Sequence, residues 1–104
     1  MMELMNDEVR AALPPLYANE NKSLAETMAT VKYFTPWANW TWYATEFDGE
    51  DTFFGLVNGF EMELGYFSLS ELESVVGLMG MKVERDLYWE PRSVAEIQAS
   101  ALTL

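Results

Sequence analysis

The dipeptide Asn58-Gly59 constrains the fold of this chain more than any other feature of its sequence. Asn-Gly is the pair best suited to a two-residue type I′ hairpin turn, because both central residues of that turn need a positive φ. Such a turn fixes the cross-strand partners, which are expected to be Val57 and Phe60, Gly55 and Met62, and Phe53 and Leu64. We therefore predict a β-hairpin over residues 53–66.

Strands alternate their side chains with a period of two, which divides this hairpin into two faces. One face is expected to be apolar and to hold Phe53, Val57, Phe60, Met62, Leu64 and Tyr66. The other face is expected to hold Phe54, Leu56, Glu61 and Glu63. Ordinary polar and apolar alternation explains Glu61 and Glu63, which would lie about 6.8 Å apart on one strand. Two such carboxylates can also act as acid and base or imitate successive phosphates, and their mixture with apolar groups suits a protein contact surface.

A helix is expected directly after the hairpin. Residues 68–73 contain two overlapping capping boxes, in which a serine precedes a glutamate by three positions: Ser68 with Glu71, and Ser70 with Glu73. Apolar residues then follow at helical spacing, namely Leu69, Leu72, Val76 and Met79. Gly80 stands where such a helix would end. The pattern predicts a helix over residues 69–79.

Shorter elements are predicted on both sides of this unit. Residues 1–13 favour a helix capped by Asn6 or Asp7 and ended by the proline pair at 14 and 15. A strand over 30–35 and an edge strand over 82–89 are expected, and a capping box at Ser93 opens a helix to about Ala101. The whole is expected to be one α+β domain over residues 1–104, an antiparallel meander of four to five strands with short flanking helices, one packed on the sheet.

The strand expected over residues 37–47 carries rings on both sides. Alternation places Trp40, Trp42 and Ala44 on one side and Thr41, Tyr43, Thr45 and Phe47 on the other. A strand with bulky groups on both faces is typical of the middle of a sheet. The hairpin connection 48–51 follows it.

Charge and missing residue types exclude several classes of function. Seventeen acidic residues against six basic ones give a formal net charge of −11, which repels nucleic acid and anionic membranes and attracts basic proteins. The same charge can simply keep an aromatic-rich domain soluble. The chain has no cysteine and no histidine, which excludes disulfides, thiolate chemistry and Ser-His or Cys-His nucleophile pairs. The charged first twenty residues are unlike a signal peptide, and no apolar run has membrane length, so we expect a cytoplasmic protein.

The densest acidic cluster surrounds Gly49. Its members are Glu46, Asp48, Glu50 and Asp51. A short loop of carboxylates can hold a hard cation such as Ca²⁺, but the spacing of a calcium-binding loop is absent, and hairpin turns favour Asp and Gly in any case. A solvated turn is the favoured interpretation, ahead of an acidic patch that faces a protein and of a metal site.

Several segments together resemble a known bacterial family. They are residues 13–17, the aromatic strand 37–43, residues 46–49, 54–57 and 63–72, and the run Glu84-Arg85-Asp86-Leu87-Tyr88-Trp89-Glu90-Pro91. The chain resembles the family called domain of unknown function 2958 over nearly its whole length. Members of that family resemble proteins that plasmids, integrative elements and phages carry as cargo, so the resemblance implies a mobile-element context. It assigns no site residue.

These observations lead to an interaction protein as the leading hypothesis. Its acidic surface, with Glu46, Asp48, Glu50, Asp51, Glu61 and Glu63 as candidate contacts, would occupy the basic groove of a nucleic-acid-binding protein or nuclease complex. Its sharpest form is an anti-restriction or anti-CRISPR protein that mimics DNA. The alternative is a regulatory or adaptor module that binds through an aromatic surface. Direct nucleic-acid binding, a cofactor, a metal and a small carboxylate enzyme are not expected.

Overall fold

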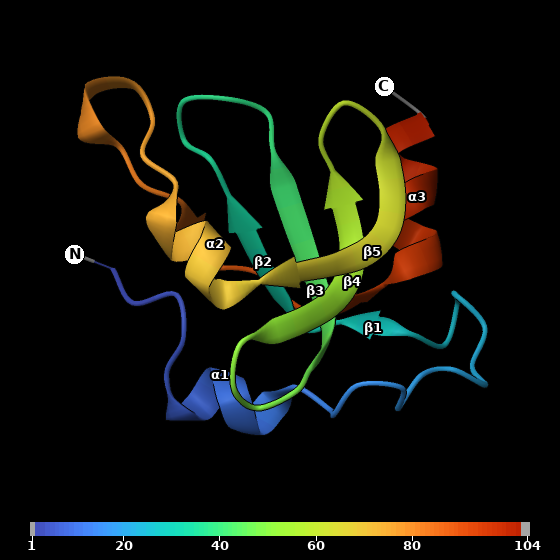
Figure 1. The fold of residues 1–104 in the computed structure, drawn as a ribbon. Coiled ribbons are helices and arrows are strands. Elements are labelled where there is room, and N and C mark those ends of the chain that lie inside the picture. The colour runs from blue at the N-terminus through green and yellow to red at the C-terminus, as the bar shows by residue number, and fades with distance from the viewer. Residues whose placement is uncertain (1, 103–104) are drawn as a thin grey trace.

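The computed structural model describes residues 2–102 and is built around one antiparallel sheet (Figure 1). The strands lie in the order β5-β4-β3-β2-β6, and their bounds are β2 (Val31–Phe34), β3 (Thr41–Phe47), β4 (Thr52–Asn58), β5 (Met62–Ser68) and β6 (Glu84–Arg85). A second, two-stranded sheet pairs β1 (Met28–Ala29) with β7 (Arg92–Ser93). The helices are α1 (Asp7–Ala12), α2 (Leu69–Ser74), the 3₁₀ turn η1 (Leu78–Gly80) and α3 (Val94–Leu102). The predicted α+β class and the meander β2-β3-β4-β5 are confirmed.

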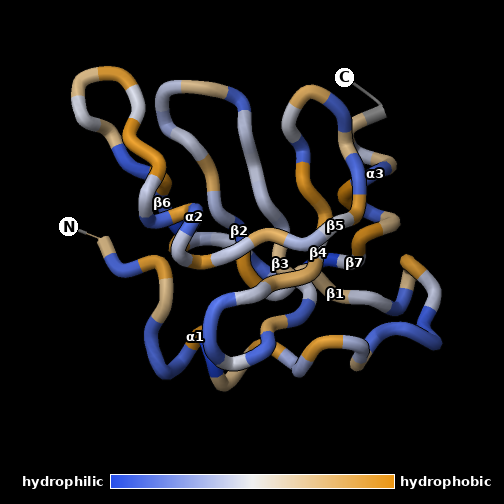
Figure 2. The backbone as a smooth tube through the Cα atoms, viewed as in Figure 1, coloured by the Kyte–Doolittle hydropathy of each residue, from blue (hydrophilic) through white to orange (hydrophobic). Residues whose placement is uncertain are grey.

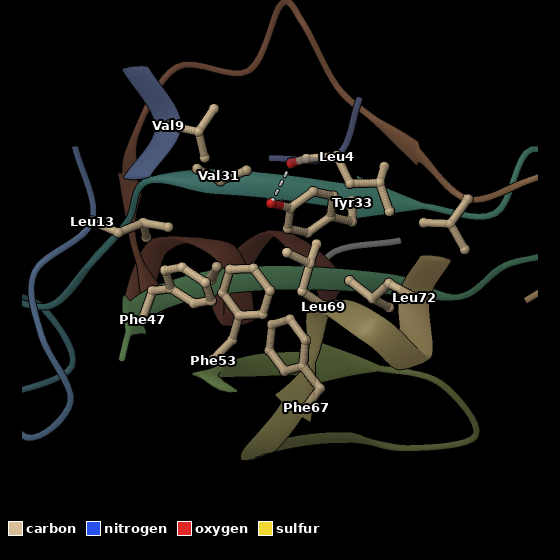
Figure 3. Packing of buried hydrophobic residues seen from close by; sticks show 12 residues of the cluster. Leu4, Val9, Leu13, Val31, Tyr33, Phe47, Phe53, Phe67, Leu69 and Leu72 are labelled. Atoms are coloured by element: carbon tan, nitrogen blue, oxygen red, sulfur yellow. Dashed lines mark hydrogen bonds between the residues drawn. The ribbon is translucent and has the colours of Figure 1, made fainter. Parts of the chain in front are cut away.

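The main core lies on the sheet face that α1 and α2 cover. One ring from each of four adjacent strands packs there, and Figure 3 shows them side by side: Tyr33, Phe47, Phe53 and Phe67. The ring centroids are 4.5 Å apart for Phe47 and Phe53 and 5.0 Å apart for Phe53 and Phe67. The buried Tyr33 hydroxyl donates to the carbonyl of Leu4 at 2.8 Å, which fixes the segment before α1. The predicted caps, Asn6 for α1 and Ser68 for α2, are both present.

The opposite face of the sheet is covered by α3, whose buried residues Val94 and Ile97 pack on Leu56. Trp89 joins this second cluster, and its indole N–H donates to the carbonyl of Ala29 at 3.0 Å. The predicted cap at Ser93 is present, since its hydroxyl accepts the Glu96 N–H. The sheet is therefore buried on both sides, as the rings on both faces of β3 predicted.

The predicted register of the β4–β5 hairpin is wrong by three residues. Asn58 pairs with Met62, so three residues rather than two connect the strands, and Phe53 faces Phe67 instead of Leu64. Neither Asn58 nor Gly59 has a positive φ. An odd slip exchanges the faces of β5, and the observed register turns Phe67 into the core beside Phe53. Burial of that ring outweighs the turn preference of Asn-Gly. The β5 residues predicted on the Phe53 face lie instead with Phe54 and Leu56: Met62, Leu64 and Tyr66.

A second difference lies in β3, where a bulge follows Ala44. Ala44 pairs with Gly55, and Glu46 pairs with the adjacent residue of β4, Phe54. Thr45 is therefore an extra residue in β3 that has no partner on β4. The bulge reverses the alternation for the rest of the strand. Phe47 therefore points into the main core, opposite to the predicted side, and Glu46 points to the face that carries α3.

The helix predicted over residues 69–79 ends at Ser74. Leu69 and Leu72 are buried as expected, but Val76 and Met79 are exposed. Gly77 explains the difference, because its α-carbon lies against the Trp37 ring and its N–H donates to the Met81 carbonyl. The chain reverses there in a loop.

Four other predicted elements are also shorter than expected. The first helix covers 7–12 rather than 1–13, and the predicted strand 30–35 is reduced to β2. The aromatic strand begins at Thr41 rather than at residue 37, and only Glu84–Arg85 of the predicted edge strand 82–89 pairs with the sheet. Met1, which falls within the predicted first helix, lies outside the described residues.

Candidate functional site

The predicted acidic turn connects β3 to β4, and Asp48 holds it in shape. One carboxylate oxygen of Asp48 accepts the backbone N–H groups of Glu50, Asp51 and Thr52 at 2.8, 2.8 and 3.0 Å. These hydrogen bonds lower the pKa of Asp48 below its usual 3.8. Asp48 therefore orders the turn and leaves the exposed Glu50 at its tip.

Two helices meet this turn and add their own carboxylates. The Asp51 carboxylate accepts the N–H and the hydroxyl of Ser70 at 2.8 and 2.9 Å, which fastens the start of α2. Arg10 of α1 donates to the carbonyl of Gly49 at 3.3 Å. We call this surface the acidic end, and its carboxylates are Asp7, Asp48, Glu50, Asp51 and Glu71.

Glu61 and Glu63 lie at the other end of the sheet, because the β3–β4 and β4–β5 connections are at opposite ends of β4. Glu61 belongs to the loop and Glu63 to the first residues of β5, opposite Val57. The expectation that both glutamates stand on one strand is therefore wrong. The six candidate contacts do not form one surface.

Exposed apolar side chains gather at the end of the sheet that holds Glu61 and Glu63. The loops β2–β3 and β4–β5 project there, together with the loop after α2 (Figure 1), and the tips of the last two carry apolar residues in Figure 2. Phe60 is 95% exposed and its ring meets that of Trp40 edge-on at 5.3 Å. Gly59 packs against the same indole ring, and a Cβ added at this position would lie 2.3 Å from the ring. We call this surface the loop-tip end, and its main apolar members are Trp40, Phe60, Leu78 and Met79.

Glu46, the remaining predicted site residue, is buried away from the acidic end. It is 5% exposed and accepts the N–H of Tyr17 at 2.7 Å on one carboxylate oxygen and the N–H of Asn19 at 3.2 Å on the other. It therefore holds the loop after the proline pair against the sheet. Tyr17 has a φ of 72°, a left-handed conformation that is uncommon for a residue with a side chain and that these bonds help to maintain.

A pocket of about 240 Å³ lies between this loop and the sheet. Its floor includes Glu46, Phe54 and Tyr66, which are neighbours in one row across β3, β4 and β5. Tyr17 forms part of the opposite wall. A hydrogen bond with the Tyr17 side chain raises the pKa of Tyr66, and partial burial and the charge of Glu46 raise it further.

Comparison with known proteins gives one decisive match. The sequence model of the family described as "Protein of unknown function (DUF2958)" matches residues 4–101. The chain belongs to this family. No curated protein and no solved structure is significantly similar to it. The family resemblance found in the sequence is confirmed over nearly the whole chain.

The DUF2958 fold offers its chemistry through carboxylates and rings. Within residues 2–102 no three Asp or Glu side chains come together as a metal site would require. No helix in that same part of the DUF2958 chain is long and apolar enough to cross a membrane. The sequence did not reveal the pocket, because its lining comes from residues 17–27, 45–46, 54 and 64–66, which no local motif connects.

Proposed function

We propose that the protein is an interaction protein of a mobile genetic element that works in the cytoplasm, where its acidic end occupies the basic nucleic-acid-binding groove of a host defence complex. The observation that carries this proposal is the acidic end itself. Three separate elements bring carboxylates to it, and the three N–H bonds to Asp48 keep the turn at its centre in one conformation. Carboxylates fixed on a rigid scaffold resemble the phosphates of a nucleic-acid strand in charge.

The physics of such a complex predicts its behaviour. Lys and Arg side chains that line a DNA groove attract the acidic end over several ångströms, and the attraction is screened within about 8 Å at physiological ionic strength. The complex should therefore weaken as salt rises and should be competed by duplex DNA. Both properties distinguish mimicry from contact through apolar surface.

The loop-tip end supports a second candidate, an adaptor module that binds through aromatic and apolar groups. Phe60 is 95% exposed and Met79 is 89% exposed, and both stand at the tips of loops. Protein interfaces are enriched in aromatic residues and methionine at their centres. Under this hypothesis the partner contacts the loop-tip end, and the acidic end only contributes solubility.

Two double variants with the same change of charge separate these candidates. Glu50→Lys with Glu71→Lys alters the acidic end, and Glu61→Lys with Glu63→Lys alters the loop-tip end. Each substitution adds two positive charges, so both variants change the net charge from −11 to −7. Wild-type and variant proteins are used to capture partners from bacterial lysate at low salt, with elution by a salt gradient or by duplex DNA and identification by mass spectrometry.

Mimicry predicts that wild type and the Glu61/Glu63 variant capture a nuclease or another DNA-binding complex, that duplex DNA releases it, and that the Glu50/Glu71 variant loses it. Purified complex then gives the direct test, since wild type should inhibit its DNA binding. Capture that persists at high salt and in the Glu50/Glu71 variant contradicts mimicry. If Phe60→Ser removes that salt-resistant capture, the adaptor hypothesis is supported.

A further inference from the structure

Glu46 is the only buried charged residue in the part of the chain that the structure describes. Buried carboxylates are normally paired with a cation, because removal of a charge from water is expensive unless another charge compensates it. No lysine or arginine of residues 2–102 lies within 4.0 Å of the Glu46 carboxylate. Its two backbone hydrogen bonds satisfy one acceptor site on each oxygen, and a carboxylate oxygen has about two. Glu46 can therefore accept further hydrogen bonds from a donor in the pocket.

The walls of the pocket are suited to a flat cation. The rings of Tyr17, Phe54 and Tyr66 line it, and Phe54 and Tyr66 meet edge-on with centroids 5.0 Å apart. Aromatic faces attract cations, and a guanidinium group stacks on them because it is planar and weakly hydrated. The volume of about 240 Å³ equals that of roughly eight water molecules at about 30 Å³ each, which is ample for such a group with its alkyl chain.

The backbone around the pocket is arranged for this side chain. The β3 bulge turns Glu46 to this face, and bulges commonly redirect a side chain next to a binding site. The loop around the left-handed Tyr17 places the N–H groups of Tyr17 and Asn19 on the carboxylate and the Tyr17 ring at the pocket wall. Strained residues of this kind are concentrated at ligand sites.

We propose that this pocket binds a guanidinium cation, with the Glu46 carboxylate as its counter-ion and the rings of Tyr17, Phe54 and Tyr66 as its walls. The cation is either an arginine side chain of another protein or a free guanidino compound. Lys22 and Glu20 stand at the edge of the pocket. The positive charge of Lys22 opposes the ligand, so its removal should strengthen binding. The site is distinct from the acidic end, whose carboxylates come from α1, α2 and the 48–51 turn.

The first experiment titrates the whole protein with N-acetyl-L-arginine methylamide and follows backbone amide NMR shifts and calorimetric heat. Shifts are expected at Tyr17, Asn19 and Thr45. The neutral citrulline analogue should not bind, and the lysine analogue should bind more weakly because its ammonium is compact and strongly hydrated. Free L-arginine identifies the source: tighter binding than the capped form assigns a free compound, and weaker binding assigns a protein side chain. Absence of binding by both forms overturns the proposal, as does equal binding of the citrulline or the lysine analogue.

Variants test which groups hold the ligand. Glu46→Gln should weaken binding of the capped arginine at least about tenfold, because the carboxylate supplies charge-assisted hydrogen bonds. Glu8→Gln, which removes the same charge from α1, should leave it unchanged, and Lys22→Gln should strengthen it. Tyr66→Leu should weaken it about two- to fivefold through the loss of one ring face, and Tyr88→Leu, at a 93% exposed site, should not. If Glu46→Gln does not fold, Tyr66→Leu decides, since it leaves the backbone bonds of Glu46 in place. Equal losses in Glu46→Gln and Glu8→Gln, or no loss in Tyr66→Leu, contradict the assignment.

Discussion

Two glycines that face each other across β4 and β5 give the sharpest test of this structure. Gly55 pairs with Gly65, yet their surroundings are opposite. A Cβ added to Gly55 would lie 2.0 Å from the backbone oxygen of Tyr43, whereas a Cβ added to Gly65 would meet nothing within 4 Å. Real Cβ atoms essentially never come closer than 3.0 Å to another heavy atom, so Gly55→Ala requires a backbone shift of β3 or β4. No side-chain rotation can relieve the contact.

The expected effect follows from what must move. Overpacking of a core where side chains can adjust costs about 1–3 kcal/mol. Here two central strands must separate, so Gly55→Ala should lower the free energy of unfolding by about 3 kcal/mol or more, out of a total near 5–15 kcal/mol for a typical domain. Gly65→Ala should be neutral or stabilise by up to about 1 kcal/mol, because alanine reduces the freedom of the unfolded chain.

Urea unfolding followed by tryptophan fluorescence measures both changes. The midpoint for Gly55→Ala should fall by roughly 1–3 M, given slopes of about 1–3 kcal/mol per M for small proteins. The Gly65→Ala midpoint should equal or exceed that of wild type. If the two variants unfold at the same urea concentration, β3 does not approach β4 as closely as described, and the bulge beside Gly55 is wrong.

Three further predictions concern hydrogen bonds. Tyr33→Phe should destabilise the protein by about 1–3 kcal/mol, because it leaves the Leu4 carbonyl buried without its donor, while Tyr88→Phe at a 93% exposed site should leave the melting temperature unchanged. Ser68→Ala should cost about 1 kcal/mol in urea unfolding, because its hydroxyl caps α2. The pKa of Asp48 is lower in the folded than in the unfolded state, so its contribution is present above the ordinary value of 3.8 and is lost as pH falls through the lower folded value. Asp48→Asn should therefore flatten the acid side of a plot of stability against pH, and an unaltered acid side would contradict that role of Asp48.

Local signals predicted which elements exist, because each depends on residues close together in the chain. The serine caps of α2 and α3, the proline pair after α1 and the two-sided strand β3 all require only neighbours within a few positions. Their lengths were predicted less well. The helix predicted to reach Met79 stops at Ser74, since the packing of Gly77 on Trp37 is a contact between distant segments that helical spacing does not contain.

The register of the central hairpin shows how a strong local signal can be overruled. The preference of Asn58-Gly59 for a two-residue turn stabilises only the turn itself. The register, in contrast, determines which side chains of the whole strand β5 are buried. Phe67 gains a place beside Phe53 only in the observed register, and the neighbouring Leu69 is buried with it. Side-chain burial along the whole strand therefore determines the register, and the turn preference does not.

The position of Glu46 follows from one residue that alternation cannot predict. With regular alternation after Ala44, Glu46 would point into the core of rings and Phe47 would point to the pocket. The bulge at Thr45 exchanges them, and the Thr45 hydroxyl donates to the carbonyl of Phe54 at 3.0 Å, which holds the extra residue in place. Because of this exchange the Phe47 ring lies in the apolar core, and the Glu46 carboxylate accepts hydrogen bonds from the loop N–H groups. Both side chains are therefore in favourable surroundings only when the bulge is present. The close approach of β3 to Gly55 and the carboxylate at the floor of the pocket are therefore two consequences of the same inserted residue.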